Sequence, residues 1–554
     1  MNVAVAPQPP RSRVLAGVDA AARRLGLDWF ELATLIALAG LSLIPLAALL
    51  SKGRPLSGAD GLLATDQMQY LAWIREASNH VLIGNVWDLA PGDRAFLHPG
   101  FLLSGVLHRV LGVSIPLAYL LWKPVAIGVT FGGCLAYCRR LLPAGGQRRS
   151  GLVLALFAVM PAVAIVAFTG IGGKPTQYTF DFISGEMWSS QYLWGYLLTS
   201  VAVFTVPFVL LGIERWRARP RARLLVLCGL GALMVTWLQP WQGAELGLIV
   251  FAAEGLRWWR GGTRPAVPAL LAVGAGVALP SAYYFVLSHA DPAWELAGQA
   301  NQPGAQALWS WPWWAMALTL APLAIPAAFA YRRPAPAWQD VAVRIWPFAV
   351  LAVYLLPLGT FPYHSFQGLA LPLSILAVQG VASTGIRLRP AVVVAILAVM
   401  TLPGIAHKLD VARSSVQAGG DPFYVFPGEV AALKALERDP RPGGVLAPTY
   451  ASYMTPYRTG REVYVGPFSW TPNWQRRQQQ ANDLFEGRLT GAKARAFVRS
   501  TNARWLFADC RPLTDLTDTL RPLLAGPPRR YGCATVYELK YRPAMGRAAG
   551  SPDA

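Results

Sequence analysis

The stretch FELATLIALAGLSLIPLAALL at residues 30–50, followed by TDQMQYLAWIREASNH at residues 65–80, decides the architecture of this chain. The first stretch is apolar and long enough to cross the hydrocarbon core of a bilayer, which takes about 20 residues. The second is polar and charged, so it does not continue the span. Its residues Met68, Leu71 and Ala72 follow helical spacing, and we expect an amphipathic helix outside the bilayer. The chain thus leaves the membrane after one crossing and presents a carboxyl group, Asp66, as it does so.

The composition indicates the same class of protein. Of 554 residues, 54% are hydrophobic and only 14% are charged, whereas soluble domains carry about 25% charged residues. The net charge of +20 raises the question of nucleic-acid binding. The arginines, however, are spread over many short loops between apolar blocks, which is typical of the cytoplasmic loops of membrane proteins. We therefore expect no nucleic-acid partner.

The apolar blocks predict a polytopic α-helical membrane protein with about eleven transmembrane helices. The predicted spans are 30–50, 114–137, 151–170, 191–213, 222–238, 243–256, 266–288, 312–331, 344–359, 367–385 and 390–406. The positions of the arginines predict the orientation. If residues 1–28 are cytoplasmic, the loops expected on that side are all rich in arginine, whereas Lys174 is the only Lys or Arg in the alternate loops 171–190, 239–242, 289–311 and 360–366. We expect a multi-pass protein of the plasma (inner) membrane, with its C-terminal part outside.

Four parts follow from this pattern. Residues 1–28 form a cytoplasmic N-terminal segment, and residues 29–407 form the transmembrane domain with a large first external loop at 51–113. Residues 408–545 read as an extracytoplasmic α/β domain, and residues 546–554 as a disordered tail. In the α/β domain, GVLAPTYASY, REVYVGPF, ARWLFADC and ATVYELKY read as short strands, and GEVAALKALERD, NWQRRQQQANDLFEG and TGAKARAFVRSTN as helices. Cys510 and Cys533 lie beside predicted strands, either as a disulfide or as two buried thiols.

The chemistry should lie on the external side, where acidic residues are scarce. Asp66 begins a surface helix near the end of the first span, where it can accept a proton from an acceptor hydroxyl or amine. The structural alternative is a first-turn residue that complements the helix dipole. Asp181 and Glu186 lie in the second external loop and are the other catalytic candidates. These three carboxylates are also the candidate ligands of a divalent cation such as Mg²⁺ or Mn²⁺.

Further external residues fit a phosphate-bearing lipid and a sugar. Lys174 in a Gly-Gly-Lys-Pro turn can meet an anion, and His98 and His364 can donate to phosphate oxygens, although each His also has a purely structural reading. Gln239 and Trp241 in WLQPWQG form either a tight turn or a cavity wall. The full set of candidate substrate-binding residues is Gln67, Tyr70, Arg94, His98, Lys174, Gln239, Trp241, Tyr363, His364 and Gln367. The chain has no GxxxxGK[ST], HExxH or GxSxG motif, so nucleotide hydrolysis, zinc proteolysis and serine hydrolysis are unsupported.

This layout resembles the GT-C glycosyltransferases, in particular the protein O-mannosyltransferase and aminoarabinose-transferase branch. TDQMQYLAWIREA at 65–77 resembles the family segment that carries a catalytic carboxylate early in the first external loop, with Asp66 at its acid and Gln67 where a second acid is usual. FPYHSFQGLALPLSILA at 361–377 resembles a segment that opens a late span and often carries Arg where this chain has His364, Ser365 and Phe366. The stretch from GGVLAPTYASY to ARWLFADC resembles the small tail domain of many bacterial members.

The resemblance implies a glycosyltransferase that takes a hexose or pentose from a polyprenyl-phosphate carrier by inverting displacement. The sugar passes to an external glycan, lipid or protein acceptor, and family members often work without a metal. Two alternatives remain. One is a transporter or flippase of lipid-linked saccharides with an external regulatory domain, and the other is a non-catalytic scaffold that binds such lipids through its tail. The sequence identifies neither the sugar nor the acceptor.

Overall fold

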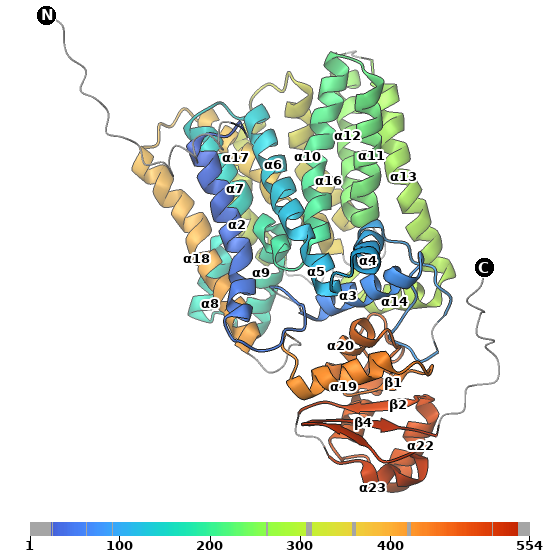
Figure 1. Cartoon of the computed structure of the whole chain (residues 1–554). Coiled ribbons are helices and arrows are strands. Elements are labelled where there is room, and N and C mark those ends of the chain that lie inside the picture. The colour runs from blue at the N-terminus through green and yellow to red at the C-terminus, as the bar shows by residue number, and fades with distance from the viewer. Residues whose placement is uncertain are drawn as a thin grey trace, which may run out of the picture.

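The computed structural model describes residues 24, 26–61, 64–90, 92–261, 264–305, 313–356, 362–417, 423–511 and 514–540. The predicted disordered tail 546–554 and most of the segment 1–28 lie outside the described residues. In the described residues up to 417 the regular elements are α-helices (Figure 1) and two short 3₁₀ helices, named η1 and η2. The elements are α2 (Trp29–Leu50), α3 (Ala64–Asn79), α4 (Pro99–Leu111), α5 (Ile115–Leu120), α6 (Trp122–Leu141), α7 (Gly146–Phe157), α8 (Pro161–Thr169), α9 (Gly173–Met187), η1 (Ser189–Leu193), α10 (Leu197–Ala218), α11 (Ala222–Leu238), α12 (Pro240–Gly261), α13 (Val267–Ala290), α14 (Pro292–Ala305), α15 (Trp313–Ala330), α16 (Trp338–Leu355), η2 (Pro362–Phe366), α17 (Ala370–Ser383) and α18 (Pro390–Gln417).

Six stretches of helix in the described part are long and apolar enough to cross a bilayer: Trp29–Leu50, Ile115–Leu141, Leu197–Ala218, Val267–Ala290, Trp313–Ala330 and Pro390–Ser415. Helices α7 and α8 together are also long and apolar enough to form one span, with a bend of 47° between them. Helices α11 and α17 are apolar but shorter than the six stretches above. The chain is therefore a multi-pass helical membrane protein. Every segment predicted as a span overlaps a helix, but the count of eleven crossings is not confirmed. Helices α12 and α16, with 22 and 18 residues, are long enough but lack a sufficiently apolar stretch with few charges.

The bend between α7 and α8 has a local cause. Pro161 is the first residue of α8, where its missing N–H costs nothing, and it prevents α7 from continuing into α8. The freed backbone is satisfied from a distant helix, because the Val159 N–H donates to the Met400 carbonyl of α18 over 3.0 Å. The break is thus held by packing in the bundle.

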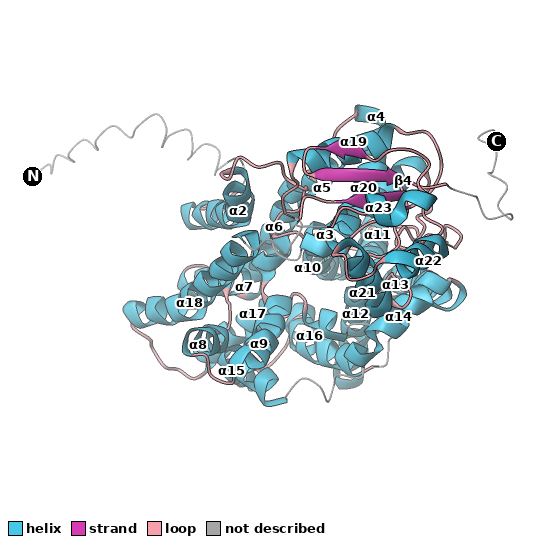
Figure 2. Cartoon of the chain, turned by 90° about the horizontal axis from the view of Figure 1, so that it is seen from below, coloured by secondary structure: helices cyan, strands magenta, loops and turns pink. Residues whose placement is uncertain are grey.

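The first loop and the C-terminal domain meet at one end of the bundle (Figure 1). The Ser57 N–H donates to the Phe423 carbonyl over 2.9 Å, and the Val463 N–H donates to the Val86 carbonyl over 2.9 Å. Helix α3 lies between α4 and the tail. Seen from below, the tail covers the part of the bundle that holds α3 and leaves α8, α9 and α15 uncovered (Figure 2). The parts predicted to be external thus share one end of the molecule, while the side of the membrane they face stays a prediction.

The tail is a four-stranded sheet with helices packed against it. Its strands are ordered β1-β2-β4-β3, with β1 and β2 parallel and the other two pairs antiparallel. The elements are α19 (Pro427–Arg438), β1 (Val445–Leu446), α20 (Thr449–Thr459), α21 (Trp474–Phe485), α22 (Gly491–Thr501), β2 (Trp505–Ala508), α23 (Thr517–Leu520), η3 (Arg521–Leu523), β3 (Arg529–Tyr531) and β4 (Ala534–Glu538).

Of the predicted strands, one is confirmed only over two residues and one is wrong. GVLAPTYASY is a strand only at β1, because Pro448 ends the extended run and the helix α20 follows it and packs on α3. REVYVGPF forms a single bridge, Val463 to Val445, instead of a strand.

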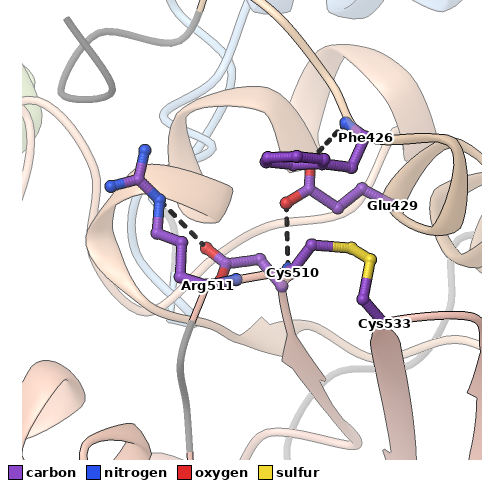
Figure 3. The surroundings of a disulfide bond; sticks show 6 residues. Phe426, Glu429, Cys510, Arg511 and Cys533 are labelled. Carbon is purple, nitrogen blue, oxygen red and sulfur yellow. Dashed lines mark hydrogen bonds and ion pairs between the residues drawn. A yellow bond between two sulfur atoms is a disulfide. The ribbon is translucent and has the colours of Figure 1, made fainter.

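Of the two readings of the tail cysteines, the structure has the disulfide between Cys510 and Cys533, which joins the end of β2 to the turn before β4 (Figure 3). The Glu429 carboxylate lies beside it and accepts hydrogen bonds from the Cys510 N–H at 3.0 Å and the Phe426 N–H at 2.9 Å. These contacts tie the start of α19 to the sheet.

Candidate functional site

The start of α3 is fixed by a buried ion pair below it. Lys123 of α6 contacts the Asp60 carboxylate at 2.5 Å and donates to the carbonyls of Ser42 at 2.9 Å and Leu193 at 2.8 Å. The Asp60 N–H in turn donates to Oε1 of Gln67 over 2.6 Å. Gln67, predicted to contact substrate, is therefore a buried side chain that holds the first turn of α3 in place.

Asp66 stands next to Gln67 in that first turn and is partly exposed. Its Oδ2 accepts a hydrogen bond from the Tyr196 hydroxyl at 2.8 Å. Burial raises the pKa of Asp66, although the hydrogen bond from Tyr196 and the charge of His364 act in the opposite direction; the negative charge of Glu186 raises the pKa further. A carboxylate with a raised pKa is a stronger base than an ordinary surface aspartate, as a general base requires.

A second group of polar side chains surrounds Glu186 at the end of α9. Its Oε2 lies 3.2 Å from Nδ1 of His364 and accepts a hydrogen bond from Nε2 of Gln367 at 3.0 Å. Oε1 of Gln367 accepts from Nε2 of Gln239 at 2.5 Å, and the indole ring of Trp241 meets the His364 ring edge-on at 4.9 Å. Three separate segments, α9, the α11–α12 turn and η2, thus converge on this carboxylate.

The two groups lie within electrostatic range of each other, because the charges of His364 and Glu186 both affect the pKa of Asp66. The Tyr70 ring lies 6.3 Å from the Tyr196 ring on the Asp66 side. Of the predicted site residues, the structure brings together Asp66, Tyr70, Glu186, Gln239, Trp241, His364 and Gln367. Tyr363 is buried beside them against Phe182, with ring centres 5.4 Å apart.

Asp181, the third catalytic candidate, lies elsewhere. It is five residues from Glu186 on α9, which turns its side chain about 140° away around the helix. Its Oδ1 lies 2.7 Å from Nε2 of His407 and 3.3 Å from Nζ of Lys408, both on α18. Burial alone would raise the pKa of Asp181, but the hydrogen bond from His407 and the charge of Lys408 hold this pKa below its usual value.

Three predicted binding residues also lie apart from Asp66. His98 is buried, accepts a hydrogen bond from the Phe101 N–H at the start of α4, and stacks on the Phe101 ring at 4.0 Å. Burial lowers the pKa of His98 to about 3, so it stays neutral and has the structural role that was its alternative reading. Arg94 pairs with Glu76 at 3.1 Å, and Lys174 is an exposed side chain in the first turn of α9.

The predicted divalent-metal set is not assembled. Asp181 is held by His407 and Lys408, so it does not join Asp66 and Glu186. Within the described ranges, no three His, Cys, Asp or Glu side chains gather in a way that could hold a metal ion. These residues do not fit a three-carboxylate metal site, and no step of the chemistry below depends on one.

Tyr196 is the site residue that the sequence pattern did not reveal. The fourth span was predicted to begin at 191, whereas α10 begins at Leu197 and residues 189–193 form η1 outside it. Residues 191–196 therefore belong to the loop that faces Asp66. The Gly at position 195 just before Tyr196 could have marked the boundary, since its φ of 108° ends the helical path.

The comparisons with known proteins concern the fold. No protein-family model and no curated protein sequence matches the chain. Among solved structures, the arabinofuranosyltransferase AftD from Mycobacteria is similar over 91% of this chain and 40% of its own length, with a TM-score of 0.51 and 14% identity.

Two further structures resemble the chain less well. The oligosaccharyltransferase AglB from Archaeoglobus fulgidus matches with a TM-score of 0.47 and 11% identity over 89% of this chain and 70% of its own. ArnT from Cupriavidus metallidurans, bound to undecaprenyl phosphate, has a TM-score of 0.47 and 12% identity over 91% of this chain and 97% of its own. On the strength of the similarity to AftD, the chain has the fold of the GT-C membrane glycosyltransferases.

Proposed function

We propose that this chain is a membrane glycosyltransferase. It moves a sugar from a polyprenyl-phosphate carrier to an extracytoplasmic glycan, lipid or protein acceptor, with inversion at the anomeric carbon. The observation that carries this proposal is the placement of Asp66. It is a partly exposed carboxylate of raised pKa, fixed at the end of the bundle beside Glu186 and His364. The fold shared with an arabinofuranosyltransferase supports the same class of reaction.

The proposed step is a direct displacement. The acceptor oxygen attacks the anomeric carbon, the bond from that carbon to the phosphate oxygen breaks, and the electron pair leaves with the phosphate. Asp66 takes the proton of the acceptor hydroxyl, as its basicity allows. Tyr196 orients the Asp66 carboxylate through its hydrogen bond. His364, partly exposed and held by Glu186, supplies a donor for the phosphate oxygens as charge develops on them.

The disulfide supports the proposed orientation independently of the arginine pattern. Disulfides persist in oxidising compartments and are rare in the cytosol. A tail that carries the Cys510–Cys533 bond is therefore expected outside the cytoplasmic membrane. Because Asp66 and the tail lie at the same end of the molecule, the reaction would take place on the outer face.

The experiment is an assay of the purified protein against a panel of polyprenyl-phosphate hexoses and pentoses, with Asp66→Asn beside the wild type. An asparagine can still accept the Tyr196 hydrogen bond, so the fold should persist. Loss of a general base should lower kcat by about 10²–10⁴. Tm and detergent gel filtration control for folding. Wild-type turnover in the variant would remove Asp66 from the mechanism, and lipid-linked sugars that cross vesicles unconsumed would favour a transporter instead.

A further inference from the structure

A small hollow lies where the first loop, α14 and the tail meet. Its walls are aromatic: Trp73 from α3, Phe96 from the first loop, Trp294 from α14 and Trp470 from the tail. Trp470 meets Trp73 edge-on at 5.3 Å and Trp294 at 5.2 Å, and Phe96 lies 4.8 Å from Trp294. The enclosed part measures about 10 Å³, which is room for one water molecule or one hydroxyl group.

The polar groups at this hollow are hydrogen-bond acceptors and an amide. Asp93 is exposed at its rim, and among the described residues its carboxylate has neither a hydrogen bond nor an ion pair. Asn85 donates to the Trp470 carbonyl over 2.9 Å, and Asp291 accepts from the Trp294 N–H over 3.0 Å. None of the lining residues is Lys, Arg or His. Aromatic rings beside unpaired carboxylate oxygens suit a neutral polyhydroxylated ligand and disfavour an anion.

The hollow is connected to Asp66 by aromatic side chains. Trp73 follows Asp66 by seven residues on α3, which places it roughly 10 Å further along the helix axis. The Tyr70 ring lies between them, 6.2 Å from the Trp73 ring and 6.3 Å from that of Tyr196. The hollow therefore lies roughly 10 Å from Asp66 along the axis of α3.

We propose that this hollow binds a neutral sugar residue of the acceptor, with one hydroxyl in the enclosed space and the ring over Trp294 and Asp93. The inference rests on the proposed function and adds to it that the acceptor is a glycan. The donor is a poor occupant, because its polyprenyl chain must stay in the bilayer, whereas Trp470 belongs to the tail domain. The tail thereby contributes directly to acceptor binding.

The test compares Trp294→Ala and Asp93→Asn with the control Phe468→Ala. Phe468 is exposed, lies near Trp470 in the same loop and does not line the hollow. Because Asp93 is exposed and unpaired, its substitution should not disturb folding. With neutral oligosaccharide acceptors, each test variant should raise the acceptor KM about two- to tenfold at unchanged donor KM, as the loss of one aromatic or hydrogen-bonded contact predicts. The control should match the wild type.

A second readout is independent of catalysis. Neutral oligosaccharides without donor should change the tryptophan fluorescence of the wild type, and this response should weaken in Trp294→Ala and in Asp93→Asn. If the wild type transfers sugar but both variants keep the acceptor KM and fluorescence response of the control, the acceptor site is refuted and the transferase remains. If no lipid-linked sugar is consumed but the fluorescence response is specific to the hollow, the binding site stands and the transferase is refuted.

Discussion

The hydrogen bond between Tyr196 and Asp66 makes a quantitative prediction for the variant Tyr196→Phe. The tyrosine hydroxyl stabilises the charged form of the carboxylate and so lowers its pKa against the effect of burial. Removing the hydroxyl removes only this stabilisation. The pKa of Asp66, already raised in the wild type, must therefore rise further.

The size of the shift follows from the strength of such a bond. A hydrogen bond to a charged group contributes about 1.5–3 kcal/mol, and one pKa unit corresponds to about 1.4 kcal/mol. Because Asp66 is partly exposed, the lower half of this range applies, which gives an increase of roughly one to one and a half units. Activity needs the ionised carboxylate, so the acidic limb of the pH–kcat/KM profile should move to higher pH by that amount, while the rate at high pH changes much less.

The assay is initial-rate transfer from a polyprenyl-phosphate sugar across the pH range, with Tyr119→Phe as the matched control. Tyr119 is a buried tyrosine in the same neighbourhood whose hydroxyl donates to the Gly195 carbonyl over 2.6 Å and not to Asp66. Its variant loses a comparable bond without touching the carboxylate, so its acidic limb should stay in place. An acidic limb that does not move in Tyr196→Phe, or that moves equally in both variants, would refute the assignment of this limb to Asp66.

Three further predictions concern other parts of the molecule. Asp181→Asn removes the charge partner of the buried Lys408 and should destabilise the protein by about 2–3 kcal/mol. This is less than the full cost of breaking a buried pair, because the backbone carbonyl of residue 181 still accepts a hydrogen bond from Lys408. A thermal unfolding midpoint equal to that of the wild type would contradict this, and the double variant Asp181→Asn with Lys408→Met should recover part of the lost stability. Cys510→Ser opens a loop of sequence separation 23 and should lower the free energy of unfolding of the tail by about 3 kcal/mol in a denaturant titration. Alkylation of both Cys510 and Cys533 in the unreduced wild type would show that the bond is absent. EDTA should leave sugar transfer unchanged, because Asp181 does not join Asp66 and Glu186 as a metal ligand; restoration of a lost activity by Mg²⁺ or Mn²⁺ would overturn that reading.

The pattern of apolar residues located most of the helices, because a helix needs either an apolar face or a long apolar run, and both are visible in the sequence. It found α3 within about one residue of its observed bounds, and it placed Asp66 in a first turn. It misassigned α20, whose Thr and Tyr residues favour strands, because packing on α3 outweighs that local preference. The sequence pattern thus predicts the secondary structure that a segment prefers in isolation. Tertiary contacts determine the structure where, as in α20, they outweigh that preference.

The site was predictable only in part for a similar reason. Glu186 and Asp181 look equivalent as two acids in one loop, but the helical turn of α9 sends one toward His364 and the other toward Lys408. The span predicted to end at 406 hid His407 and Lys408, since α18 continues to Gln417. The partners of an acid depend on helix phase and on segments distant in sequence, and neither is visible in a local motif.

The ion pair beneath α3 also constrains how the chain is assembled. Lys123 enters the bilayer on α6 before its acceptor carbonyl at Leu193, 70 residues later, has been synthesised. Asp60 precedes it in the chain, so the ammonium can be neutralised as soon as α6 arrives. Asp60 would thus neutralise Lys123 during translation, before the rest of the bundle has formed. The hydrogen bond from Lys123 to the Leu193 carbonyl of η1 would form only later, when η1 and α10 are added.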